Sequence, residues 1–364
     1  LASLYAYYYM KHRLLHLDAI KGLAILLVIM GHIHIFAARA EHPMYSYFMA
    51  FIKAVHMPLF FLIAGYFAQR PVSTLPQLGR YLKDKTIRLI TPALLFLGLL
   101  TLWNRGTIDL SPKELLEAHY WFTPALFIYF LVFLLQRWGI GQIVERLGAK
   151  ASKALELGLH GAATIALCYT LTKLPLYRSS LCSLDLERLR VTMACLYPYV
   201  VIGFLIGRLE LLPRLRSHSA GLTSFALLVV SIGLLRYYSY DTPYLSYGLW
   251  HNDRLMALSF FAFLVYTFGL MTEGSSKVGK AFVFLGNWSL PIYLVHYFFI
   301  PILPPLDTLL PALEPSARLP LELLLYFAGA LVTLLPTLAV IYCLKFNPYL
   351  DFLLFGEKDR LEKG

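Results

Sequence analysis

Long apolar runs constrain this chain more than any other feature of its sequence. Hydrophobic residues make up 59% of the 364 positions and charged residues only 15%, against roughly 25% charged in an ordinary soluble domain. The apolar residues gather in stretches of about 20, the length that an α-helix needs to cross a bilayer core of about 30 Å. The sequence therefore predicts an all-α fold, a polytopic integral membrane helical bundle.

The hydropathy pattern predicts ten transmembrane helices joined by short loops. Their approximate ranges are 17–37, 48–68, 87–103, 120–138, 157–174, 191–212, 219–237, 255–272, 282–305 and 319–343. We expect one transmembrane domain over 17–343, with a cytoplasmic N-terminal segment, 1–16, before it and a cytoplasmic C-terminal tail, 344–364, after it.

The charge distribution predicts the orientation of the bundle. The chain has 32 lysine and arginine residues against 21 acidic ones, a net charge of +11. With the N-terminus in the cytoplasm, 20 of the 32 fall in inner segments and 10 in outer loops. This asymmetry is the positive-inside rule, and it predicts a protein of the cytoplasmic (inner) membrane with both termini in the cytoplasm. The charge thus indicates topology and contact with membrane lipids, and no nucleic acid is expected as a partner.

A lysine and a histidine stand out in the first apolar run, LDAIKGLAILLVIMGH (17–32). Eleven residues separate Lys21 from His32, which places them within about 20° on a helix and about 16 Å apart along it. Such groups are costly in hydrocarbon and should face the bundle interior or a water-filled cavity. Lys21 has the alternative of reaching the inner head groups, whereas His32 lies too deep for that. The segment also resembles a cleavable signal peptide that ends near Ala38-Arg39-Ala40, but its central polar residues disfavour that reading.

Two further spans carry a histidine at a similar depth. Counted from the inner ends, His32, His56 and His296 lie about 22, 18 and 21 Å into the membrane. Three histidines in one layer predict a polar cavity in which a neutral imidazole acts as a general base. A metal site is the alternative, but no carboxylate or thiolate shares that depth. Ser289 shares a face with His296, yet the two are about 10 Å apart along the axis, too far for a nucleophile and its base.

Five motifs follow one another along the chain in the order found in a known family. They are Lys21-x10-His32, His56-Met57-Pro58-Leu59-Phe60-Phe61, Lys85-Thr86-Ile87-Arg88, Tyr120-Trp121-Phe122 and the stretch SLPIYLVH that ends at His296. Together they resemble the membrane acyltransferase-3 family, and the first two spans are most similar to its fucose 4-O-acetylase-like branch. The chain departs from the family pattern at Lys85, where arginine is usual, and at Ala64, where serine is frequent.

The resemblance implies an integral membrane enzyme that transfers an acyl group, usually acetyl from acetyl-CoA, to a hydroxyl of a sugar, a cell-surface polysaccharide or a glycolipid. Acyl-CoA would be a donor substrate, and no bound cofactor or metal is implied. His32 would be the general base or would itself accept the acyl group, and Lys21 would orient the donor. Residues that would line the substrate cavity are His56, Trp121, Asn287, Ser289 and His296.

Lys85 and Arg88 would hold the CoA phosphates at the cytoplasmic mouth of the third span, where the resemblance and the charge pattern meet. This is the most basic loop that we expect in the chain. Phosphate binding is one reading, and topology charge beside lipid head groups is the other. Trp121 has a similar alternative, since aromatic residues commonly anchor a span at the interface.

Two other classes of protein would also use polar groups within a membrane. A transporter or flippase of a small or lipid-linked substrate is the main alternative, because intramembrane Lys and His residues also mark substrate pathways. The sequence shows no two-fold internal repeat of the kind that many transporters have. A sensor that keeps only the fold is the other alternative, and the retention of Lys21, His32 and the Lys85/Arg88 pair disfavours it.

Overall fold

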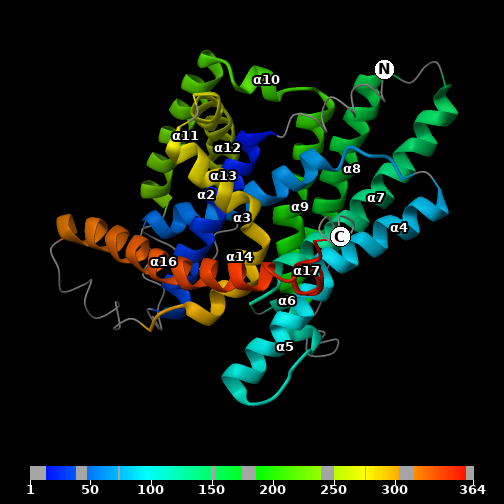
Figure 1. Cartoon of the computed structure of the whole chain (residues 1–364). Helices are drawn as coiled ribbons and strands as arrows, with labels where there is room; N and C mark the ends of the chain where they lie inside the picture. The colour runs from blue at the N-terminus through cyan, green and yellow to red at the C-terminus, as the bar shows by residue number, and fades with distance from the viewer. Residues whose placement is uncertain are drawn as a thin grey trace. The chain divides into compact units, whose positions relative to one another are not determined.

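Every regular element that the structure describes is helical. The structure is a computed structural model, and it describes residues 14–37, 47–72, 74–117, 119–148, 152–173, 186–238, 250–274, 276–302 and 315–357. Figure 1 follows the helices along the chain. The prediction of an all-α fold is confirmed.

Most of the predicted spans correspond to long apolar helices. Within the described ranges, eight helices could cross a membrane: Leu15–Ile35, Phe48–Phe67, Leu75–Arg105, Phe122–Leu147, Lys153–Lys173, Leu189–Arg208, Asn252–Glu273 and Pro320–Lys345. The predicted span 219–237 corresponds to a shorter apolar segment, His218–Leu234. A polytopic membrane bundle is therefore confirmed.

The predicted ninth span, 282–305, is wrong as a single straight helix. The chain forms three short pieces there: α13 (Lys277–Asn287), α14 (Ser289–Val295) and the 3₁₀ turn η5 (His296–Phe299). Pro291 accounts for the break at Trp288, because proline has no N–H to donate to the carbonyl of Asn287 and its ring clashes with that carbonyl. The depth of His296 was counted along one straight helix, so that count does not apply to the bent segment.

The chain divides into two compact units, and the first comprises Leu1–Phe60, Glu210–Ser289 and Ile302–Ala330. Its helices are α2 (Leu15–His32), most of α3 (Tyr47–Phe67), α10 (Leu212–Leu215), α11 (His218–Tyr238), α12 (Trp250–Glu273), α13 and the first half of α16 (Pro315–Lys345). In this unit α2 packs against α12 and α13, and α11 packs against α12 (Figure 1).

Two glycines allow α2 and α13 to pack backbone against backbone. A Cβ atom on Gly22 would lie 1.9 Å from the carbonyl oxygen of Phe282, and one on Gly286 would lie 1.7 Å from the carbonyl oxygen of Asp18. Real Cβ atoms do not approach that closely, so only glycine fits at either position. The crossing fixes the turns that carry Lys21 and Asn287, which are the immediate neighbours of the two glycines.

The second unit comprises Phe61–Leu209, Leu290–Pro301 and Leu331–Gly364. Its helices are α4 (Leu75–Lys85), α5 (Thr91–Arg105), α6 (Pro112–Glu117), α7 (Phe122–Leu147), α8 (Lys153–Lys173), α9 (Leu186–Arg208), α14, the second half of α16 and α17 (Pro348–Phe355). A π-helical turn, η2 (Thr86–Ile90), joins α4 to α5. Helices α7, α8 and α9 pack on one another, and α17 packs on α5.

Candidate functional site

The residues nominated from the sequence fall in both units. The first unit carries Lys21, His32, His56, Asn287 and Ser289, and the second carries Lys85, Arg88, Trp121 and His296.

Lys21 and His32 lie on one continuous α-helix. Helix α2 runs from Leu15 to His32, so the regular helical spacing that puts the two residues on one face applies along its whole length. His32 is half-buried and is the last residue of α2 before the π-helical turn η1 (Ile33–Ala37). Such turns are rare and occur frequently at functional sites.

An ion pair that sequence reasoning missed accompanies Lys21. The Lys21 ammonium lies 2.7 Å from the carboxylate of Asp18, whose side chain is only 9% exposed. Residues three positions apart are neighbours on a helix surface, so the ion pair could have been predicted from the sequence. Asp18 offsets the charge of Lys21, which reduces the cost of keeping a lysine in apolar surroundings.

A backbone carbonyl fixes which nitrogen carries the hydrogen in the neutral rings of His56 and His296. Nδ1 of His56 lies 2.5 Å from the carbonyl oxygen of Ile52, and Nδ1 of His296 lies 3.0 Å from that of Ile292. A carbonyl only accepts, so Nδ1 carries the hydrogen of the neutral ring and Nε2 is left as an acceptor.

The described residues contain no group of three or more His, Cys, Asp or Glu side chains that could hold a metal ion.

The segment around Trp121 is fastened to α14, so two of the sequence motifs meet in the second unit. The Tyr120 hydroxyl donates to the carbonyl of Leu294 at 2.8 Å, and the Tyr293 hydroxyl donates to the carbonyl of His119 at 3.1 Å. His119 lies just before the α7 span, and burial lowers the pKa of its imidazole. The ring of Tyr120 also contacts that of Tyr293 edge to face.

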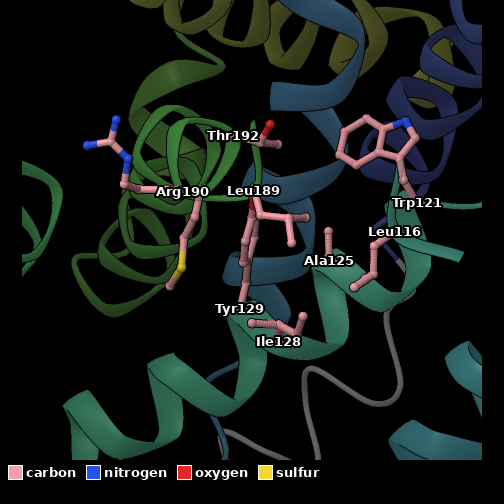
Figure 2. Close-up of a pocket in the computed structure, with 9 residues that line it drawn as sticks. Leu116, Trp121, Ala125, Ile128, Tyr129, Leu189, Arg190 and Thr192 are labelled. Atoms are coloured by element: carbon pink, nitrogen blue, oxygen red, sulfur yellow. The ribbon is translucent and has the colours of Figure 1, made fainter. Parts of the chain in front are cut away.

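A pocket of about 290 Å³ opens beside Trp121 (Figure 2). Its lining is mostly apolar and comes from Leu116, Trp121, Ala125, Ile128, Tyr129, Leu189, Arg190, Thr192 and Met193. Figure 2 shows the Trp121 indole at one side and the Arg190 side chain at the other. Of the cavity residues nominated from the sequence, only Trp121 belongs to this lining.

The predicted basic loop around Lys85 and Arg88 is wrong, because the segment is helical. The hydroxyl of Thr74 caps α4, and a proline occupies its first turn, two features that favour a helix start. Lys85 ends α4, and its ammonium lies 3.7 Å from the ring centroid of Phe130. Arg88 lies within the π-helical turn η2 and is exposed.

The first unit also contains a buried hydrogen-bond network that the sequence did not predict. Nδ1 of His34 lies 2.5 Å from the Tyr326 hydroxyl, and the Tyr326 hydroxyl also hydrogen-bonds the side chain of Glu322. All three residues are buried. His34 and Tyr326 are 292 positions apart, so no local pattern could have joined them.

Apolar helices long enough to cross a membrane, with histidines and a lysine–aspartate pair buried among them, define an integral membrane protein with polar groups packed between its helices. The acyltransferase domain of the acyltransferase-3 family matches residues 14–344, and the chain belongs to that family. It is a membrane acyltransferase, as the five motifs indicated; the fucose 4-O-acetylase-like branch stays a prediction. No curated protein and no solved structure matches the chain significantly.

Proposed function

We propose that this membrane acyltransferase moves an acyl group, in the simplest case acetyl, from acyl-CoA to a hydroxyl of a sugar, a cell-surface polysaccharide or a glycolipid. The observation that carries the proposal is the position of the family-like pair. Lys21 and His32 lie on one helix within the matched range 14–344. We also propose insertion in the cytoplasmic membrane with both termini inside, on the charge asymmetry of the sequence.

The reaction needs a group that takes a proton from the acceptor, and in this proposal it is His32. Its imidazole accepts the hydroxyl proton as the hydroxyl oxygen attacks the acyl carbonyl carbon. The new C–O bond forms, the thioester C–S bond breaks, and the proton passes from His32 to the sulfur of CoA. In the covalent variant, the imidazole of His32 attacks the acyl carbonyl carbon and the C–S bond breaks to release the CoA thiolate. The acceptor hydroxyl then attacks the acyl-imidazole, its proton passes to the thiolate, and the C–N bond breaks to restore His32. Lys21, paired with Asp18, orients the donor.

The acceptor needs a surface that suits both a sugar ring and an apolar carrier. The Trp121 pocket offers aromatic faces from Trp121 and Tyr129 together with an aliphatic lining (Figure 2). Aromatic side chains present broad apolar faces together with polar tips. In the first unit, His56 is half-buried and has Nε2 as the acceptor atom of its ring, so it can accept a hydrogen bond from a hydroxyl; His296 is fully buried.

The donor phosphates are held at η2 in this proposal, and Arg88 makes the main contact. Its guanidinium is exposed and can bind phosphate through two parallel hydrogen bonds. The ammonium of Lys85 instead lies against Phe130 and acts as a point charge. Arg88 should therefore matter more than Lys85.

We expect Arg88→Gln to raise the KM for acyl-CoA, to leave kcat nearly unchanged and to flatten the salt dependence of KM. A contact made equally in the ground and transition states changes KM rather than kcat. Salt weakens such a contact because the Debye length falls from about 10 Å at 0.1 M to about 3 Å at 1 M. KM at these two salt concentrations, normalised to inserted protein, measures the effect.

Lys83→Gln is the matched control, since Lys83 is an exposed cation of the same helical segment. If Arg88 provides only topology charge, both variants lower the amount of inserted protein and leave KM unchanged. That result would remove the donor site from η2.

A further inference from the structure

The backbone that follows α17 lies directly against the turn that carries Arg88. Helix α17 ends at Phe355, and Gly356 caps it in the left-handed conformation, with φ of 69°. A Cβ atom on Gly356 would lie 2.8 Å from the carbonyl oxygen of Ile87 and 2.9 Å from Cα of Arg88. The cap of α17 thus lies against the backbone of η2 itself, not only against its side chains.

A buried ion pair anchors α17 beside the C-terminal end of α16. The Lys345 ammonium lies 2.8 Å from the carboxylate of Asp351, and these side chains are 7% and 0% exposed. The same ammonium lies 2.9 Å from the carboxylate of Glu357, just after the cap. Buried charges are stable only with well-placed partners, so this arrangement favours one position of α17.

An aromatic stack fixes the other side of α17. The ring of Phe355 stacks on that of Phe96 in α5, with centroids 5.9 Å apart and planes inclined by 20°. Phe96 also contacts Phe298 of η5 edge to face at 6.4 Å. Phe298 is two residues beyond His296, so α5 connects the cap of α17 with the turn that begins at His296.

We infer that α17 is a positioning element for the donor site, which holds the backbone of η2 so that Arg88 presents its guanidinium to the CoA phosphates. The inference rests on the proposed donor role of Arg88. The residues of α17 act through that arginine and do not themselves touch the donor. Two facts support this role. Arg88 lies in a π-helical turn, a geometry that is rare and occurs frequently at functional sites. Gly356 packs on that same turn.

Gly356→Ala tests the inference, with Gly106→Ala as its control. Gly106 caps α5 with nearly the same φ, 71°, but nothing lies within 4 Å of a Cβ built there. Both variants therefore carry the backbone cost of alanine in the left-handed region, and only Gly356→Ala pushes on η2. We expect Gly356→Ala to raise the acyl-CoA KM about 10-fold with kcat nearly unchanged, as for a lost phosphate contact. Gly106→Ala should keep the parent KM.

A double-mutant cycle shows whether the effect passes through Arg88. In an Arg88→Gln background, Gly356→Ala should add little to KM, because coupled residues give non-additive changes. Asp351→Asn, which removes the charge that faces Lys345, should raise KM in the same direction and should likewise depend on Arg88.

The possible results distinguish a failure of the positioning role of α17 from a failure of the proposed function. If Arg88→Gln raises KM but Gly356→Ala equals Gly106→Ala, only the positioning role is overturned. Additive effects in the cycle would also overturn it, since they mean that α17 acts on something other than Arg88. A parent protein without saturable dependence on acyl-CoA overturns the proposed function and this inference together.

Discussion

The His32→Ala protein is expected to insert and fold like the parent and to transfer acyl groups at least about 10²-fold more slowly, the lower end of what a positioned general base contributes. The reason is positional: His32 ends α2, eleven residues after Lys21 on the same helix, and is half-buried. The loss should appear in kcat rather than in the KM for acyl-CoA. A covalent acyl-histidine route predicts at least as large a loss.

His218→Ala is the control, since His218 is an exposed histidine at the start of α11. Transfer rates per molecule of inserted protein compare the two variants with the parent. Activity of His32→Ala within a factor of a few of the parent would remove His32 from the mechanism.

The Gly286→Leu protein is expected to lose its fold. Even a single Cβ would meet the carbonyl oxygen of Asp18 at 1.7 Å, and a backbone group cannot turn aside as a flexible side chain can. Overpacking within a core typically costs about 1–3 kcal/mol, and a backbone clash between two helices should cost more. The yield of monodisperse protein in mild detergent and its thermal unfolding temperature measure the loss.

Gly233→Leu provides the comparison, because Gly233 lies on the same unit and a Cβ there meets nothing within 4 Å. It should extract and unfold like the parent. A folded and active Gly286→Leu protein would contradict the backbone-to-backbone crossing of α2 and α13.

Hydropathy predicts most of this fold because a span of about 20 apolar residues is a physical requirement of the bilayer. It does not reveal where a span breaks. The run 282–305 is mostly apolar, yet Pro291 ends the preceding helix at Asn287. The third span shows the opposite error: its helix begins at Leu75, because Thr74 and a first-turn proline start α4 in a segment that is too polar for a hydropathy window.

The sequence likewise predicts one part of the candidate site and not the other. Local spacing predicts that Lys21 and His32 share a face, and the continuous α2 supports the geometry behind that prediction. Asp18 was equally visible at three residues before Lys21. Two other contacts join residues that are far apart in the sequence: the hydrogen-bond network His34–Tyr326–Glu322 and the contact of Gly356 with η2. Such contacts depend on tertiary packing, which a single sequence does not reveal.

Acyl transfer from CoA to a hydroxyl can be measured directly with the reconstituted protein. Purified protein in liposomes is incubated with radiolabelled acetyl-CoA and a panel of methyl glycosides of hexoses and 6-deoxyhexoses, and free CoA thiol and labelled glycoside are quantified together. We expect thiol release matched mole for mole by an acetylated glycoside, and loss of both in His32→Ala. Passage of a glycoside across the membrane without any thiol release would contradict it and would indicate a transporter instead.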